Sequence, residues 1–473
     1  MTIMTLDRTE PTFLKSGRGR PWRAALAGQP VTVVGLARSG VAACRLLRAL
    51  GARVTGTDAR AAAALPGPAR ALAAEGVRLV LGGHPPEAFE AARLVIVSPG
   101  VPADHPALAS CRERGLPVLG EVELAYRTMT AEFIAITGTN GKTTTTALAG
   151  ALLSESGRPV LVGGNIGRPL ASEALTFPED GWVVAEVSSF QLETTDAFRP
   201  HVATVLNVTP DHLDRHGSLV AYAEAKARIF RAQGQGDWAV LNADDPGAAA
   251  LASRVKARLL WFSRRQPVPQ GAWVRDGWVT LRLGGDQPVC PVSEIFLRGA
   301  HNLENVLAAT ASVGALGVSP SRLRAAIRAF RAVPHRLEWV RERGGVAFYN
   351  DSKGTNVDAT LKALAAFDEP IVLIAGGRDK GQRFDALADA AAGRVKAAVV
   401  IGEGRATLGP ALRAVTRVEE AESMGEAVRR AAALAAPGDV VLLSPACASF
   451  DLFRDYEHRG AVFAEEVRAL PEP

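Results

Sequence analysis

The chain has 473 residues, of which 48% are hydrophobic and 22% charged. These values are typical of a globular protein with two or three domains, and they argue against a disordered or fibrous chain. The net charge of +5 is modest, and outside the first 23 residues basic side chains are interspersed with acidic ones. A clustered basic face is typical of nucleic-acid binders, so this pattern argues against nucleic acid as a partner and favours small anions such as nucleotides.

The cysteines and the N-terminus indicate the compartment. Cys44, Cys111, Cys290 and Cys447 lie far apart and form no CxxC pair, which argues against a disulfide framework and favours a reducing cytoplasm. No apolar run is long enough to span a bilayer. Residues 1–29 contain charges and proline where a secretory signal would have an apolar stretch. We therefore expect a cytoplasmic protein with no membrane span, and a flexible extension over residues 1–29.

Short apolar β-type runs alternate with helical stretches along the chain, which is typical of α/β units with largely parallel sheets. In a first block the sequence predicts strands at 31–35, up to residue 58 and at 94–97, with a helix over 39–50 and a break at 120–130. In a second block it predicts strands at 133–136, 182–186 and 202–206 and a hairpin excursion at 266–291. A third block restarts near residue 334, with strands at 346–349, 371–375, 398–401 and 440–443.

These blocks predict an α/β protein of three domains over residues 30–126, 127–333 and 334–473, a division that fits ordinary domain sizes. The first and third blocks are Rossmann-like, and the second is similar to a P-loop ATPase.

A phosphate loop is the strongest local motif. A strand ending at Ile136 runs into a glycine-containing loop, and Lys142 and Thr143 open the next helix. Glycines allow backbone N–H groups to face phosphate oxygens, and the helix N-terminus adds partial positive charge. Lys142 can reach the β- and γ-phosphates, and the Thr143 hydroxyl suits Mg²⁺. The match to the Walker pattern is incomplete, because Ile136 stands where that pattern has its first glycine.

Three further side chains are candidates for the same site. Glu186 ends a strand, at the edge of the sheet where open α/β folds bind ligands, and a carboxylate there can hold Mg²⁺. His212 follows the next strand, although Asp211 and Asp214 compete with it as metal ligands. Lys226 lies in the middle of a helix, and the sequence alone favours a surface lysine.

At these residues the chain resembles the Mur ligase family. The resemblance extends through later motifs to the C-terminus and covers the chain from about residue 31. It rests on the segments 138–143 (GTNGKT), 186–193 (EVSSFQLE), 207–214 (NVTPDHLD), 299–305 (GAHNLEN), 334–336 (PHR), 350–356 (NDSKGTN) and 443–449 (LSPACAS).

The resemblance implies an ATP-dependent ligase of peptidoglycan precursor synthesis. It would convert a substrate carboxylate into an acyl phosphate and couple it to an amine. The expected substrates are UDP-N-acetylmuramoyl-L-alanine and D-glutamate, with ATP, two Mg²⁺ sites and a monomeric chain. Lys142, Glu186, His212 and Lys226 are the expected catalytic residues. The resemblance makes Lys226 a carbamate that binds Mg²⁺ together with Thr143, Glu186 and His212, because a carbamate supplies an anionic oxygen for a hard cation.

The resemblance also assigns binding residues to each domain. For ATP they are Gly138, Thr139, Asn140, Gly141, Lys142, Thr143, Thr144, Asn305, Arg336 and Asp351. For the UDP substrate they are Arg38, Ser39, Asp58, Ser98, Gly100 and Asn165. For the amino acid they are Thr355, Lys380, Ser449, Phe450 and Tyr456.

The sequence departs from the family pattern at two places, and other functions stay open. Ala37 stands where the family often has a second glycine, and the loop from Gly35 to Gly40 also misses the GxGxxG pattern, although Asp58 follows about 20 residues on. Tyr456 stands where near relatives carry phenylalanine. The alternatives are another Mur ligase, a folylpolyglutamate-synthase-like ligase, an NAD-dependent oxidoreductase and a non-catalytic nucleotide switch.

Overall fold

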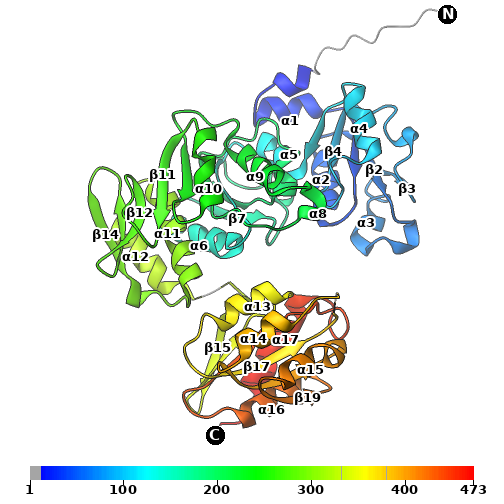
Figure 1. Cartoon of the computed structure of the whole chain (residues 1–473). Coiled ribbons are helices and arrows are strands. Elements are labelled where there is room, and N and C mark those ends of the chain that lie inside the picture. The colour runs from blue at the N-terminus through cyan, green and yellow to red at the C-terminus, as the bar shows by residue number, and fades with distance from the viewer. Residues whose placement is uncertain (1–11, 332, 380, 473) are drawn as a thin grey trace, which may run out of the picture. The chain divides into compact units, whose positions relative to one another are not determined.

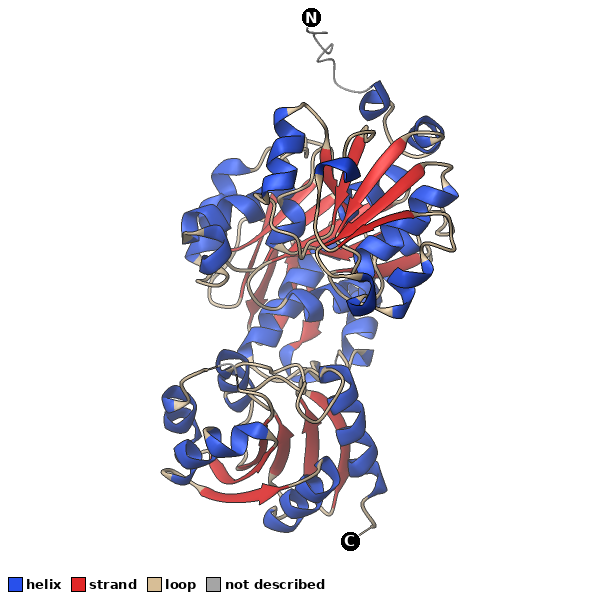
Figure 2. Cartoon of the chain, turned by 90° about the vertical axis from the view of Figure 1, so that its right-hand side faces the viewer, coloured by secondary structure: helices blue, strands red, loops and turns tan. Residues whose placement is uncertain are grey.

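A computed structural model describes residues 12–331, 333–379 and 381–472. Contacts divide the chain into two compact units. The first runs to Val292 and includes Glu304–Ile327, and the second contains Ser293–Leu303 and the chain from Arg328 onward. The first unit holds two separate sheets and the second holds one (Figures 1 and 2).

The N-terminal sheet of the first unit is parallel, with strand order β3-β2-β1-β4-β5. Its strands are β1 (Pro30–Val34), β2 (Arg53–Asp58), β3 (Arg78–Leu81), β4 (Leu94–Val97) and β5 (Val118–Gly120), and its helices are α2 (Arg38–Ala49), α3 (Gly67–Ala71), α4 (Pro106–Glu113) and α5 (Glu121–Thr128). The strand order reverses between β1 and β4, and at such a switch point open α/β sheets bind ligands beyond the carboxyl ends of the strands.

The segment that precedes β1 is folded from Thr12 onward. It forms a short 3₁₀ helix and helix α1 (Arg20–Leu26), in which Trp22 and Leu26 are fully buried. Arg18 donates to the carbonyl oxygens of Tyr126 (3.1 Å) and Ala131 (2.8 Å). The prediction of a flexible extension is therefore wrong for residues 12–29, because two apolar side chains four residues apart give α1 a buried face.

The central sheet has nine strands in the order β14-β13-β12-β11-β10-β9-β6-β8-β7, with an antiparallel end at β12-β13-β14. Its strands are β6 (Glu132–Thr137), β7 (Val160–Gly164), β8 (Trp182–Glu186), β9 (Val202–Val205), β10 (Trp238–Asn242), β11 (Arg258–Ser263), β12 (Gly271–Arg275), β13 (Trp278–Arg282) and β14 (Asp286–Pro291). The predicted hairpin excursion is this antiparallel end. The helices are α6 (Lys142–Ser154), α7 (Ser189–Leu192), α8 (Leu213–His216), α9 (Leu219–Ala227), α10 (Pro246–Ala250), α11 (Ala300–Gly314) and α12 (Pro320–Ala329).

The sheet of the second unit has the order β15-β16-β20-β17-β18-β19, parallel except for β15. Its strands are β15 (Glu338–Arg343), β16 (Val346–Asn350), β17 (Ile371–Gly376), β18 (Val395–Ile401), β19 (Arg417–Ala421) and β20 (Val440–Leu443). Its helices are α13 (Val357–Leu364), α14 (Asp385–Ala391), α15 (Leu408–Arg413), α16 (Met424–Leu434) and α17 (Tyr456–Ala469). Figure 2 shows helices on both faces of this sheet, as in doubly wound folds.

Among the residues that the structure describes, no helix combines the length and the apolar character needed to cross a bilayer.

A buried carboxyl group lies where α5 meets the central part of the first unit. Glu121, in the first turn of α5, is 2% exposed. Its Oε1 atom accepts a hydrogen bond from the Ala171 backbone N–H (2.7 Å), whereas its Oε2 atom has no hydrogen-bond partner among the described residues. Burial raises the pKa of Glu121 to about 7, because the charged form loses its hydration.

This carboxyl group should make stability depend on pH. Glutamate in an unfolded chain has a pKa of about 4.3, so between this value and about 7 the folded protein binds the extra proton. The free energy of unfolding should therefore fall as the pH rises through this window. The variant Glu121→Gln keeps an oxygen that can accept the Ala171 N–H but cannot ionise. We expect its free energy of unfolding to increase by roughly 2 kcal/mol relative to that of wild type on going from pH 5 to pH 8. Urea denaturation at both pH values measures the free energy of unfolding of each protein. The prediction would be contradicted if the variant differed from wild type by the same free energy at pH 5 and at pH 8.

Candidate active site

The phosphate loop joins β6 to α6 at the carboxyl end of the central sheet. Gly138 (φ 156°) and Gly141 (φ 83°) take backbone conformations that favour glycine, and Gly141 is the N-cap of α6. Lys142 is the first residue of the helix, and Thr143 and Thr144 follow it. The predicted strand–loop–helix setting is thus confirmed, and the helix N-terminus that it provides is a favourable site for phosphate.

The loop is held by the segment that follows β9. The Asn140 N–H donates to Asn207 Oδ1 (2.8 Å), and the Asn207 amide returns a bond to the Asn140 carbonyl (3.2 Å). The Thr139 N–H donates to the Asn207 carbonyl (3.0 Å). The Thr139 hydroxyl donates to the Thr209 carbonyl oxygen and accepts a hydrogen bond from the Thr209 N–H. These bonds fix the loop in one conformation, and such preorganisation is what a phosphate-binding loop requires.

Gly141 provides a direct test of this loop. A Cβ atom there would lie 2.3 Å from Asn305 Oδ1, which accepts the Thr145 hydroxyl bond (3.1 Å), and the positive φ adds strain. We expect Gly141→Ala to weaken ATP binding at least about tenfold, since one misplaced charge-assisted bond costs roughly that much. Isothermal titration with ATP measures the loss. Gly157→Ala, at a positive-φ turn with open space around it, is the matched control and should bind ATP normally.

Two lysines meet at the first carbonyl group of the loop. Lys142 Nζ donates to the carbonyl oxygens of Gly138 and Thr139 (2.8 Å each), and Lys226 Nζ donates to the same Gly138 oxygen (2.9 Å). Lys226 is only 1% exposed, although its position within α9 suggested a surface lysine. Burial, with a smaller contribution from Lys142, lowers the pKa of Lys226 to about 6. Its amine is therefore largely neutral near pH 7.

Glu186 lies one strand away from the phosphate loop. It ends β8, pairs in register with Ile136 of β6, and is 2% exposed. Its Oε1 atom accepts a hydrogen bond from the Asn165 side chain (2.8 Å). Its Oε2 atom is buried and has no hydrogen-bond partner among the described residues. A buried carboxylate oxygen without a donor is a suitable ligand for a hard cation such as Mg²⁺.

His212 stands apart from these groups. It has φ 51°, is the N-cap of the four-residue helix α8, and exposes half of its side chain. The centroid of its ring lies 4.9 Å from that of Phe190 and 6.4 Å from that of Tyr222. The Tyr222 ring centroid in turn lies 4.2 Å from Lys226 Nζ. An aromatic cluster therefore connects His212 to Lys226.

The described residues contain no group of three or more His, Cys, Asp and Glu side chains placed to hold a metal ion. Asp211, which competes with His212 as a ligand, faces the histidine itself, with 3.6 Å between Oδ2 and Nε2. The side chain of Asp214 lies outside the described residues.

Two of the residues predicted for the UDP substrate, Ser98 and Asp58, lie at the carboxyl ends of strands near the switch point of the N-terminal sheet. Ser98 follows β4, is buried, and donates to the Gly35 carbonyl (2.7 Å) across the switch point. Asp58 ends β2, accepts the Leu36 N–H (2.7 Å) and pairs with Arg60, which lowers the pKa of Asp58.

The other members of this set are more scattered. Arg38 and Ser39 are the first two residues of α2. The Arg38 guanidinium donates to the carbonyl oxygen of Gly167, which follows β7. Gly100 lies in the loop after β4. Asn165 bonds Glu186, so the structure places it beside the phosphate loop.

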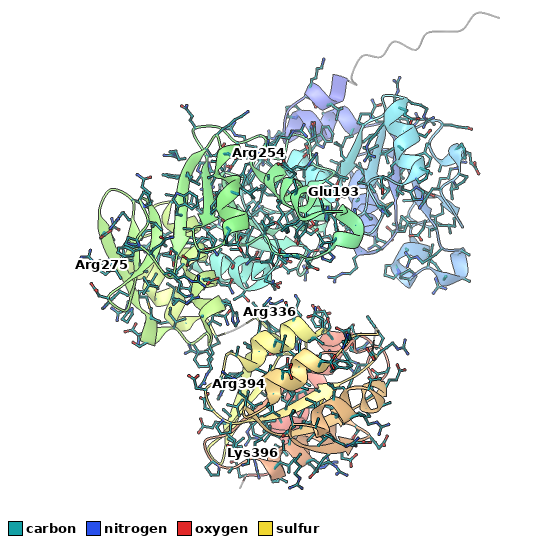
Figure 3. All side chains as sticks on the ribbon, viewed as in Figure 1. Glu193, Arg254, Arg275, Arg336, Arg394 and Lys396 are labelled. Carbon is teal, nitrogen blue, oxygen red and sulfur yellow. The ribbon has the colours of Figure 1, made fainter. Side chains whose placement is uncertain are left out.

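In the second unit, Arg336 and Asp351 lie together. Asp351 is buried, accepts the Ser444 hydroxyl (2.8 Å) and receives the Leu337 N–H (3.3 Å). Burial raises the pKa of Asp351 to about 7, and nearby Arg336, labelled in Figure 3, opposes this effect. Asn305, predicted for the same ligand, belongs to the first unit.

The residues predicted for the amino acid differ in exposure. Ser449 is buried, Thr355 is partly exposed, and Phe450 is 62% exposed. The Tyr456 hydroxyl donates to Glu457 (3.2 Å), and Lys353 Nζ lies 5.5 Å from the Tyr456 ring. Lys380 lies outside the described residues.

Sequence reasoning missed three supporting residues. Asn207 holds the phosphate loop and Tyr222 contacts Lys226. Arg459 is fully buried and donates to the Ser352 hydroxyl and carbonyl (3.0 and 2.8 Å). Only Tyr222 carried a usable signal, because it lies four residues before Lys226 on one helix and therefore on the same face.

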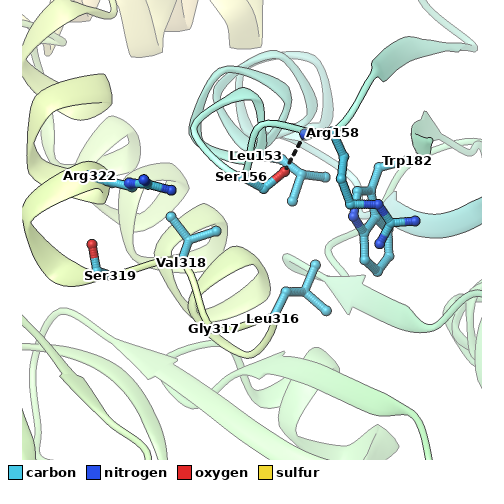
Figure 4. A pocket seen from close by; sticks show the side chains of 9 residues that line it. All are labelled: Leu153, Ser156, Arg158, Trp182, Leu316, Gly317, Val318, Ser319 and Arg322. Carbon is cyan, nitrogen blue, oxygen red and sulfur yellow. Dashed lines mark hydrogen bonds between the residues drawn. The ribbon is translucent and has the colours of Figure 1, made fainter. Parts of the chain in front are cut away.

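A cavity of about 470 Å³ lies elsewhere in the first unit (Figure 4). It is lined by Leu153, Ser156, Arg158, Trp182, Leu316, Gly317, Val318, Ser319 and Arg322. Trp182 begins β8, whereas Glu186 ends it, so this cavity opens at the opposite edge of the sheet from the phosphate loop. It takes no part in the site described above.

Comparison with protein families gives three matches in chain order. Residues 29–120 match the family "Mur ligase MurD-like, N-terminal domain", residues 136–313 match "Mur ligase middle domain", and residues 335–447 match "Mur ligase, glutamate ligase domain".

Curated relatives match nearly the whole chain. UDP-N-acetylmuramoylalanine–D-glutamate ligase of Acidobacterium capsulatum is 50% identical over 94% of this chain and 97% of its own. The protein of the same name from Koribacter versatilis is 47% identical over 94% and 98%.

Solved structures share the fold at lower identity. UDP-N-acetylmuramate-alanine ligase MurC from Thermotoga maritima has a TM-score of 0.57 at 20% identity, covering 93% of this chain and 99% of that protein. A pseudomurein peptide ligase type C from Methanothermus fervidus has a TM-score of 0.55 at 19% identity, covering 88% and 96%.

Proposed function

Because the chain belongs to the Mur ligase family, we propose that it is an ATP-dependent ligase that joins D-glutamate to UDP-N-acetylmuramoyl-L-alanine. The names of relatives that are 50% and 47% identical over nearly their full length support this choice of substrates. The observation that carries the chemistry is the phosphate loop, at which Lys142 and Lys226 share the Gly138 carbonyl and beside which Glu186 lies buried. We place the reaction in the cytoplasm and take a single chain as sufficient for it.

The reaction follows from the charges at this loop. The carboxylate of the UDP substrate attacks the γ-phosphorus of ATP, and the bond from that phosphorus to the bridging oxygen breaks to give ADP and an acyl phosphate. Lys142 and the backbone N–H groups at the N-terminus of α6 stabilise the negative charge that moves through the transferring phosphoryl group. The D-glutamate amine then attacks the acyl carbon, loses a proton, and expels inorganic phosphate to leave an amide.

Magnesium would neutralise phosphate charge at this site. The residues fit such an ion, because the Glu186 Oε2 atom is buried without a donor and the Thr143 hydroxyl lies at the start of α6. We propose two ions, held by Thr143, Glu186, His212 and a carbamate on Lys226. A buried amine that is largely neutral is the form that reacts with CO₂, which supports the carbamate.

The substrates would be divided among the three domains. The switch point of the N-terminal sheet, with Asp58, Ser98 and the loop from Gly35, would hold the uridine diphosphate. For ATP we further propose Asn305 of the first unit, and Arg336 and Asp351 of the second. Thr355, Ser449, Phe450 and Tyr456 would receive D-glutamate, as would Lys380.

Release of inorganic phosphate tests the function. We expect release only when ATP, Mg²⁺, UDP-N-acetylmuramoyl-L-alanine and D-glutamate are all present, and a panel of D- and L-amino acids should show a strong preference for D-glutamate. Release that ignores the UDP substrate would indicate a nucleotide switch. Ligation to a folate acceptor, or oxidation of NADH, would indicate one of the other two alternatives.

A further inference from the structure

The helix that presents His212 is too short to hold its own orientation. Helix α8 contains only Leu213–His216, and Leu213 is 41% exposed. Isolated helices of this length are unstable in water. The placement of α8, with His212 as its N-cap residue, therefore depends on tertiary contacts, which Arg215 and His216 make in addition to the contact of the His212 ring with Phe190.

Both side chains bind to the segment that follows β8. His216 lies 3.1 Å from the Ser189 hydroxyl and 3.4 Å from the Glu193 carboxylate. Arg215 donates to Glu193 Oε2 (2.8 Å), and its guanidinium lies over the Phe190 ring at 4.0 Å. Arg215 and Glu193 are each less than 20% exposed. A partly buried ion pair that also stacks on a ring holds its geometry far better than an exposed pair. Glu193 is labelled in Figure 3, where the side chains are drawn as sticks.

Arg215 also reaches the N-terminal sheet. Its second terminal nitrogen donates to the Pro99 carbonyl oxygen (3.2 Å), in the loop that follows β4. The neighbouring residue Ser98 donates to the Gly35 carbonyl. A continuous series of contacts thus runs from the Gly35 loop through Ser98, Pro99 and Arg215 to the helix that carries His212.

From this geometry we infer that Arg215 is a positioning residue that couples occupation of the UDP-substrate site to the placement of His212. The inference rests on the proposed function for the identity of the substrate. Arg215 touches neither the nucleotide loop nor the reacting atoms in the described contacts, and it acts through Pro99 on one side and α8 on the other. The planar guanidinium is necessary, because a lysine cannot donate to Glu193 and Pro99 at once while stacking on Phe190.

Two variants distinguish the contact of Arg215 with Pro99 from its contact with Glu193. Arg215→Lys should keep the ion pair with Glu193 and lose the bond to Pro99. We expect it to raise KM for the UDP substrate about tenfold, the cost of one charge-assisted hydrogen bond, with kcat and KM for ATP within about twofold of wild type. Arg215→Met should lose both ends, so that kcat also falls about tenfold. Arg254→Met is the matched control, because Arg254 pairs with Glu224 of α9 but both side chains are about half exposed; it should leave all constants unchanged.

Titration with UDP alone keeps the test independent of turnover. We expect the Kd for UDP to rise about tenfold in Arg215→Lys and to stay unchanged in Arg254→Met, with melting temperatures of both variants within about 4 °C of wild type. If wild type binds UDP but releases no phosphate, the proposed function fails while the UDP titration still tests Arg215. Constants for Arg215→Lys that match wild type, or an equal loss for UDP and ATP, would overturn the inference.

Discussion

Replacing Lys226 by alanine should reduce ligation at least about a hundredfold, the loss that follows removal of one preorganised charged group from an active site. Lys226 is buried beside Lys142 and bonded to the phosphate loop. If its carbamate supplies an oxygen to Mg²⁺, the truncated side chain leaves a space in which a small carboxylate can provide the same donor. We therefore expect formate or acetate at high concentration to restore part of the activity, measured as phosphate release.

An exposed lysine of the same domain serves as the control. Lys256→Ala, outside the site, should have normal activity and no response to formate or acetate. A Lys226→Ala protein with normal turnover would remove this lysine from the site. A third outcome is a variant that folds and binds ATP normally but has no ligase activity, even with added carboxylate. That result would argue against the carbamate and leave a role for the amine itself.

Replacing Lys142 by alanine should abolish ADP formation and ligation together, with a loss of about a thousandfold. The residue opens α6 directly after Gly141, where its ammonium can follow the charge of the transferring phosphoryl group. Quenched single-turnover assays of ADP and of the amide product measure both losses.

The comparison with Lys142→Arg shows what kind of interaction is lost. Arginine keeps the positive charge but fits the loop poorly, so we expect partial ATP binding and poor phosphoryl transfer. If Lys142→Ala formed ADP at the normal rate while failing to make the amide, Lys142 would act after phosphoryl transfer and the assignment would be wrong.

Elements with one dominant local signal could be predicted from the sequence. Strands β4 (Leu94–Val97) and β8 (Trp182–Glu186) have the predicted bounds, because strands covered on both faces read as continuous apolar runs. The edge strand β19 (Arg417–Ala421) was not predicted, since three of its five residues are charged, and edge strands of this kind are held by pairing with a neighbour rather than by burial.

Only part of the geometry of the candidate site could be predicted from the sequence. The loop with Lys142 follows from a local pattern of glycine and lysine. The burial of Lys226 does not, because α9 is rich in alanine and shows no clear polar face, so only the packing around it decides which side chains are covered. The pairing of Glu186 with Asn165 and of Arg215 with Pro99 joins residues 21 and 116 positions apart, and no local pattern in one sequence records such contacts.

Transfer of labelled oxygen tests the chemistry most directly. With UDP-N-acetylmuramoyl-L-alanine carrying ¹⁸O at both oxygens of its alanyl carboxylate, formation of an acyl phosphate moves one labelled oxygen into the phosphate released during ligation to D-glutamate. We predict that mass spectrometry of the phosphate will show one ¹⁸O atom for each amide formed. Unlabelled phosphate accompanying labelled substrate and full amide formation would contradict the account.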